Sequence, residues 1–206
     1  DMNAKRESFP TLSSADGYKG NCAMLITRST GDFGSRLGMP IAAGNLFMGT
    51  FDILSAVTNA LKATKFGMPF EHVPTYLTGY YKYKAGPEFS ESGKVVSGKK
   101  DIFDIYAIFY ETTEDVKMLD GTNKFSHPNL ISIARIDNPK ETDEWTQFYL
   151  PFKMQPGKTI DRDKLKAGKY NVAIVFSSSV EGDLFNGAIG STLYIDEVEL
   201  IHSVEE

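Results

Sequence analysis

The chain has 206 residues, a net charge of −5 at pH 7 and a single cysteine, Cys22. Lys and Arg are scattered without the basic stripe typical of nucleic-acid binding, no apolar run is long enough to enter a membrane, and one cysteine excludes an internal disulfide. The length fits one domain over residues 1–206.

Segments with the pattern of β-strands follow one another along almost the whole chain. Each is rich in β-branched or aromatic residues and is bounded by Gly, Pro, Asn or Asp. In chain order they are residues 22–28, 44–52, 74–84, 102–111, 130–136, 145–152, 170–178 and 192–201, the last with a slip that predicts a bulge. Residues 53–64 are expected to form one short helical connection. Such a series predicts an all-β jelly-roll sandwich of two antiparallel sheets.

Motifs that would identify an enzyme do not fit. Residues 93–99 match the start of a phosphate-binding loop, but Lys100 replaces the required Ser or Thr and a strand follows, so a hairpin tip is expected. His72, His127 and His202 have no metal-binding spacing. The serines at 177–179 are expected to satisfy backbone groups at a strand end. Glycoside hydrolysis needs only two facing acids, and sequence spacing does not test that.

Residues 74–84 form the densest aromatic stretch. Strand alternation puts Tyr81 and Tyr83 on one face, and Tyr80 and Lys82 on the other. One face should be core, while the other would present rings against which the C–H groups of a sugar can stack. The alternative is that the tyrosines fill a wide core with their hydroxyls at its rim.

Asp196 is the candidate metal ligand. It lies in the last predicted strand, and a carboxylate beside a bulge suits calcium, which prefers several oxygen ligands. Asp16 and Glu7 are candidate co-ligands, because the termini of a jelly roll commonly lie near each other. The alternative is an outward-facing acid on a strand.

Several motifs resemble one family. They are residues 43–47 (AGNLF), 66–70 (FGMPF), 79–84 (GYYKYK), 177–183, 185, 187 and 190–198, together with Trp145 and Phe148. From about Cys22 to Leu200, the sequence is similar to the putative carbohydrate metabolism domain family. This resemblance implies a galactose-binding-like jelly roll of the carbohydrate-binding-module kind, but no catalytic residues. In related sugar-binding jelly rolls a final-strand Asp helps bind structural calcium, and Asp196 matches it, whereas the N-terminal acidic partner is not clearly matched.

The resemblance also implies a setting. It predicts the C-terminal module of a longer exported protein, such as a secreted or envelope lipoprotein of gut bacteria, placed at the cell surface, in the periplasm or outside the cell. The expected partners are a glycan or polysaccharide and other domains of the same chain.

We therefore expect a non-catalytic carbohydrate-binding or glycan-associated module. The candidate stacking residues are Tyr80, Tyr83, Phe89 and Trp145, and the candidate polar neighbours are Asn45, Lys82 and Asp183. The alternatives are a structural or adhesin-like interaction module of the cell surface and a glycan-active hydrolase.

Overall fold

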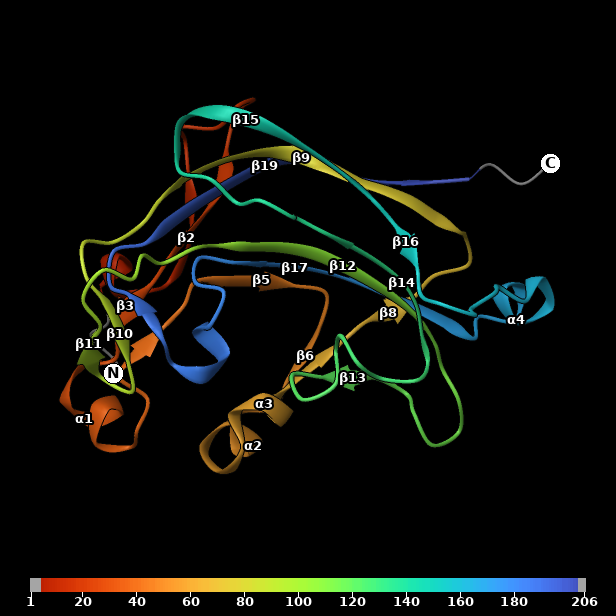
Figure 1. Cartoon of the computed structure of the whole chain (residues 1–206), viewed down its shortest axis with the longest axis horizontal. Coiled ribbons are helices and arrows are strands. Elements are labelled where there is room, and N and C mark those ends of the chain that lie inside the picture. Colours follow the sequence, from red (N-terminus) through yellow and green to blue (C-terminus); the bar gives the residue numbers. More distant parts are fainter. Residues whose placement is uncertain (1–4, 204–206) are drawn as a thin grey trace.

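Two antiparallel sheets pack face to face in the computed structural model, which describes residues 5–203 (Figure 1). The first sheet has the strand order β1 (Thr11–Ser14), β2 (Cys22–Ile26), β19 (Thr192–His202), β9 (Pro74–Lys84) and β15 (Thr142–Pro151). The second has the order β16 (Lys153–Met154), β14 (Leu130–Arg135), β12 (Asp104–Glu111), β17 (Tyr170–Ser177) and β5 (Asn45–Phe47), and β8 (Met68–Pro69) also pairs with β17. The predicted all-β sandwich is confirmed.

The main core lies between these sheets. Alternation along β9 directs Leu77, Tyr81 and Tyr83 inward, where they belong to one cluster with Ile105 of β12 and Phe176 of β17. Leu77 and Ile105 are fully buried. Shortening a buried side chain of this size to Ala typically costs about 2–5 kcal/mol, so this layer contributes strongly to the stability of the sandwich.

The outer face of the second sheet is also partly covered. A third, small sheet of β6 (Gly49–Phe51), β7 (Thr64–Phe66) and β13 (Leu119–Asp120) lies beneath it with α2 (Ile53–Thr58) and α3 (Ala60–Ala63) (Figure 1). Its Phe66 and Leu119 join Tyr106, Ile108 and Tyr110 of β12 in a second apolar cluster. Burial on both faces explains why β12 is almost continuously apolar in sequence.

Two elements that the sequence predicts as continuous are each interrupted in the structure, at the point where the chain leaves the second sheet. The strand predicted at 44–52 becomes β5 and β6, and the helix predicted at 53–64 becomes α2 and α3. Gly49 lies at the first division with a φ of 150°, and a Cβ there would stand 1.9 Å from the Lys65 carbonyl oxygen. The predicted bulge in β19 is confirmed between Asp196 and Glu199.

The remaining elements are all short. They are η1 (Arg6–Ser8), β3 (Arg28–Ser29), α1 (Gly31–Arg36), β4 (Ile41–Ala42), β10 (Phe89–Glu91), β11 (Lys94–Val95), α4 (Arg162–Lys166), η2 (Gly182–Leu184) and β18 (Gly187–Ala188). The hairpin of β10 and β11 confirms that the phosphate-loop-like segment is not a helix start. Within the described residues, no helix is both long and apolar enough to cross a membrane.

A buried polar network surrounds Asp101, which is 1% exposed. Its Oδ2 accepts hydrogen bonds from Ser179 Oγ at 2.6 Å, Ser191 Oγ at 2.7 Å and the Ala188 N–H at 2.7 Å. Burial raises the pKa of the Asp101 carboxyl, although these donors oppose that effect. In the same serine run, Ser178 Oγ accepts a backbone N–H at 2.9 Å, so the strand-end role predicted from sequence is confirmed there.

Candidate functional site

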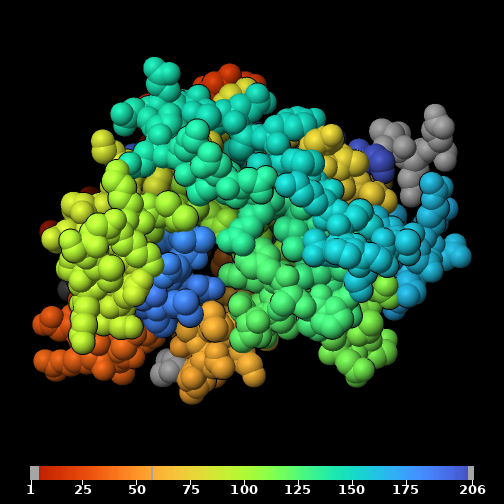
Figure 2. Space-filling model, viewed as in Figure 1, coloured from red at the N-terminus to blue at the C-terminus, as the bar shows by residue number. Residues whose placement is uncertain are grey.

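A pocket of about 200 Å³ opens on the outer face of the second sheet, beside the small third sheet. In Figure 2 it is the hollow between the blue segment that contains η2 and the green segment that follows β13. Alternation along β5, β12 and β17 brings their side chains to this face. The polar lining residues are Asn45, Thr64, Asp104, Lys124, Ser177, Ser179 and Asp183, and the aromatic ones are Phe47, Phe51, Phe66 and Tyr106.

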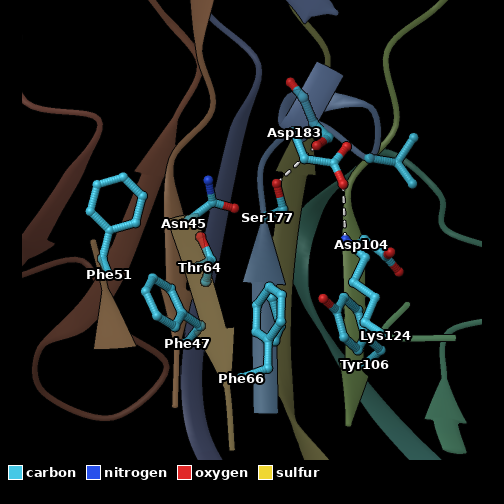
Figure 3. A pocket seen from close by; sticks show the side chains of 13 residues that line it. Asn45, Phe47, Phe51, Thr64, Phe66, Asp104, Tyr106, Lys124, Ser177 and Asp183 are labelled. Atoms are coloured by element: carbon cyan, nitrogen blue, oxygen red, sulfur yellow. Dashed lines mark hydrogen bonds and ion pairs between the residues drawn. The ribbon is translucent and has the colours of Figure 1, made fainter. Parts of the chain in front are cut away.

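Aromatic rings form the wall toward the third sheet. Phe47 of β5 and Phe66 of β7 meet edge to face, with ring centroids 5.9 Å apart, and Tyr106 packs in the same way on Phe125 at 4.7 Å. Phe51 of β6 is different, because its side chain stands apart at the edge of the pocket (Figure 3) and the residue is 54% exposed. The pocket therefore has a fixed apolar wall and one accessible ring.

Two ion pairs flank the polar side. The carboxylate of Asp104, whose side chain is 7% exposed, accepts two hydrogen bonds from Arg135, at 3.1 Å from Nε and 2.7 Å from Nη2. Burial raises the pKa of the Asp104 carboxyl, and the guanidinium offsets part of that rise. Lys124 Nζ lies 3.0 Å from Asp183 Oδ2 (Figure 3). Each carboxylate lining the pocket is therefore paired with a cation.

The hydroxyl of Tyr106 is the one group of this wall left without a hydrogen bond. Tyr106 is 2% exposed, and its Oη has no hydrogen-bond partner among the described residues. Burial raises the pKa of this phenol, and the nearby carboxylates of Asp104 and Asp183 act in the same direction, so the hydroxyl keeps its proton. A buried hydroxyl is normally hydrogen-bonded, so the unpartnered oxygen of Tyr106 is exceptional among the groups of this pocket wall.

The pocket continues into a larger apolar depression of about 440 Å³. Both spaces are lined by Asn45, Phe51, Thr64 and Asp183. The depression extends toward α1, where Phe33 is 78% exposed. The arrangement therefore joins a polar pocket to an open apolar surface.

The structure separates the residues predicted to bind carbohydrate into three groups, of which one is buried. Asn45 and Asp183 line the pocket. Tyr80, Lys82 and Trp145 lie on the outer face of the first sheet, which is a different surface. The sequence therefore identified two members of the pocket but could not place them with Tyr106, which it did not single out.

On the first sheet, Tyr80, Lys82 and Trp145 form an aromatic cluster with Tyr18 and Tyr194. The rings of Tyr18 and Tyr80 stack at 3.9 Å, and Lys82 Nζ lies 4.9 Å from the Trp145 ring and 5.0 Å from the Tyr194 ring. Lys82 Nζ also forms an ion pair of 3.1 Å with an aspartate in the loop between β1 and β2. Tyr80 and Trp145 thus already have partners on part of their surfaces, and sugar binding by this cluster stays a prediction.

Tyr83 and Phe89 correct the sequence analysis. Each is 2% exposed. Tyr83 belongs to the inward-facing half of β9, where its hydroxyl donates to the Ser178 carbonyl oxygen at 3.2 Å. The ring of Phe89 in β10 is covered by Lys99, whose Nζ lies 4.2 Å from its centroid. Because neither ring has a free face, neither can stack on a sugar in this structure.

The surroundings of Asp196 do not form the oxygen cage that calcium prefers. Asp196 lies at the bulge of β19, where Oδ2 accepts the Lys19 N–H at 2.9 Å and Oδ1 accepts the Glu197 N–H at 2.8 Å. These donors present positive partial charge to the carboxylate. Of the expected co-ligands, Asp16 pairs with the lysine of the aromatic cluster and Glu7 is exposed. The Asp196 carboxylate links the loop between β1 and β2 to β19, and calcium binding stays a prediction.

Two of the histidines lie closer together in space than their separation in the sequence suggests. The rings of His72 and His202 stack at 4.2 Å, with Phe70 against their edges. Across residues 5–203, however, no three His, Cys, Asp or Glu side chains are grouped to hold a metal ion.

Comparison with known proteins gives a family and two close structures. The family model described as "Putative carbohydrate metabolism domain" matches residues 1–201. A putative glycoside hydrolase from Bacteroides thetaiotaomicron has 67% sequence identity and a TM-score of 0.97, and the match covers 99% of this chain and 60% of that chain. A putative glycoside hydrolase from Bacteroides vulgatus has 55% identity and a TM-score of 0.92, covering 96% of this chain and 79% of that chain.

A putative sugar binding protein from Bacteroides thetaiotaomicron has 11% identity and a TM-score of 0.41, covering 98% of this chain and 86% of that chain. No curated protein matches the sequence.

Proposed function

We propose that this chain, which belongs to the putative carbohydrate metabolism domain family, binds a glycan in the pocket of Asn45, Tyr106 and Asp183 without cleaving it. Family membership makes it a carbohydrate-related domain. Non-catalytic binding of a glycan is a more specific claim than family membership, and the pocket supports it.

The unpartnered hydroxyl of Tyr106 carries this proposal. A sugar hydroxyl would supply the missing hydrogen bond once a small movement of the pocket wall uncovers the Tyr106 oxygen, and the amide of Asn45 and the hydroxyl of Ser177 offer further partners. The rings of Phe47 and Phe66 provide apolar surface for the C–H groups of the same sugar. Apolar walls with a few converging polar groups are characteristic of small-molecule sites.

Hydrolysis is the second candidate, because Asp104 and Asp183 line the same pocket. The two similar Bacteroides structures are also described as those of a putative glycoside hydrolase. A general acid must hold a proton, and burial of Asp104 favours that. The two-point pairing with Arg135 opposes it, since a guanidinium stabilises the ionised carboxylate. Binding without cleavage is therefore the function that the pocket supports best.

An interaction module is the third candidate. Phe33, Leu37, Ile53 and Leu54 are exposed by 49–84% on α1 and α2 and just after α1. Grouped exposed apolar residues are typical of contact surfaces. Flat binding to every sugar, combined with association through this surface, would favour an adhesin-like role. The location at the cell surface and lipid attachment remain proposals, to be tested by fractionating cells that express the full-length protein.

A glycan microarray followed by calorimetry tests the main proposal. We expect a restricted set of glycans to bind, and Asn45→Ala to weaken binding. Lys153→Ala, on the far edge strand β16, is the control and should have no effect. No binding to any glycan would overturn the proposal.

A reducing-sugar assay on each glycan that binds separates binding from hydrolysis. We expect no product. Release of reducing ends that disappears in Asp104→Asn or Asp183→Asn would establish the hydrolase instead.

A further inference from the structure

We infer, on the basis of the proposed function, that the pocket receives the terminal sugar of a glycan chain rather than a stretch from the interior of the chain. The inference concerns the shape of the site. Recognition of an interior stretch requires a groove that is open at both ends, whereas a chain end can enter a pocket that is closed on one side.

One end of the pocket is closed by packed side chains. Phe66 and Tyr106 line the pocket and also belong to the apolar cluster that continues along β12 through Ile108 and Tyr110. Beyond Tyr106, the outer face of the second sheet is therefore filled by the small third sheet, where Leu119 is fully buried. A linear glycan cannot pass along this face, because the space for its next unit is occupied by the protein itself.

The volume supports the same conclusion. The pocket measures about 200 Å³, which is below the range of roughly 300–1,000 Å³ typical of pockets for drug-sized ligands. One sugar ring fits such a space, and we place a second ring outside it.

The open side of the pocket shows where that second ring would lie. Three of the four residues shared with the apolar depression lie on this side, with Asn45 and Thr64 between Phe51 and the Tyr106 wall in Figure 3. Phe51 is 54% exposed, so its ring is available to a sugar. We place the terminal sugar beside Tyr106 and the penultimate sugar against Phe51.

Length series of linear glycans test this assignment. For β-1,4-galactan, β-1,4-glucan and α-1,4-glucan, the probes are the monosaccharide, the disaccharide, the tetrasaccharide and the polymer, each measured by calorimetry. In any series that binds, we expect the Kd per chain to improve from one unit to two and then stay constant. The polymer, which has few ends per unit mass, should not retard the protein in an affinity gel.

A matched pair of variants adds a second readout. Phe51→Ala should weaken binding of the disaccharide by about 3- to 10-fold, the size of an aromatic contact, and should weaken binding of the monosaccharide by clearly less. Tyr149→Ala is the control, because Tyr149 has the same 54% exposure but lies on the first sheet. It should change neither affinity.

The outcomes distinguish this inference from the proposed function. Affinity per chain that keeps rising with length, or strong retardation by the polymer, would overturn recognition of chain ends and leave glycan binding intact. Equal loss of monosaccharide and disaccharide binding in Phe51→Ala would overturn the placement of the second sugar. If no series binds and the microarray is also blank, the proposed function fails and this inference fails with it.

Discussion

Replacing Tyr106 with Phe removes a single oxygen atom from the wall of the pocket. The ring of Tyr106, with its edge-to-face contact to Phe125 at 4.7 Å, can stay in place. The oxygen makes no hydrogen bond with any described residue, so no protein partner loses a bond in the variant. The substitution therefore separates the contribution of the hydroxyl to stability from its contribution to binding.

We expect these two contributions to have opposite signs. A buried polar group without a partner costs about 1–3 kcal/mol, and the small cavity left by the missing oxygen cancels part of the gain from removing it. The free energy of unfolding of Tyr106→Phe should therefore be unchanged or higher by up to about 1 kcal/mol. Binding should weaken, because a net hydrogen bond to the ligand is worth about 1.4 kcal/mol, which is about tenfold in Kd.

Urea denaturation of the free protein and calorimetry with the best glycan measure the two effects. Tyr149→Phe is the control, since it removes the hydroxyl of an exposed tyrosine on the first sheet and should change neither quantity. Loss of more than about 1 kcal/mol of stability with unchanged affinity would refute the reasoning. Such a result would mean that the hydroxyl supports the fold and does not meet the ligand.

Three further predictions concern charge. Arg135→Ala should lower the free energy of unfolding by about 2 kcal/mol. Breaking a buried ion pair costs about 3–5 kcal/mol, and the 40% exposure of the Arg135 side chain reduces that cost. The midpoint of urea denaturation measures the loss of stability, which should become smaller in acid, where Asp104 is protonated. Burial raises the pKa of Asp101, so its ionisation destabilises the folded state, and the stability of the wild type relative to Asp101→Asn should fall as pH rises from about 4 to 7; a difference independent of pH contradicts this. If Asp196 binds calcium, EDTA should lower the Tm of the wild type more than that of Asp196→Asn, and equal Tm values with and without EDTA would exclude the site.

The sandwich was predictable from sequence because its signals are local. Strand β9 occupies the predicted residues 74–84, and β17 and β19 differ from their predicted bounds by one residue each. Alternation along β9 also separated Tyr80 and Lys82 from Tyr81 and Tyr83, as the structure has them. What alternation cannot tell is which face is the core, and the choice of Tyr83 as a stacking residue was wrong for that reason.

The pocket was not predictable in the same way, because its walls come from segments far apart in the chain. Asn45 and Asp183 were singled out, but Asp104 and Tyr106 lie in a strand whose sequence is almost continuously apolar and gives no sign of a site. A possible clue was Asp104 itself, a charge at the edge of an apolar run, since a buried acid needs a partner. That partner, Arg135, lies 31 positions later in the chain.

The amino-acid sequence by itself determined the long strands of the sandwich, the bulge of β19 and the membership of the family, because periodicity, turn residues and motifs are properties of neighbouring positions. Only the tertiary structure decided where a ligand can enter. The third sheet folds over β12, Phe66 and Tyr106 close one end of the outer face, and Phe51 remains exposed at the other. The closed end and the exposed ring both depend on contacts between segments that are far apart in the chain. Packing of the whole chain creates these contacts, and local sequence patterns do not predict them.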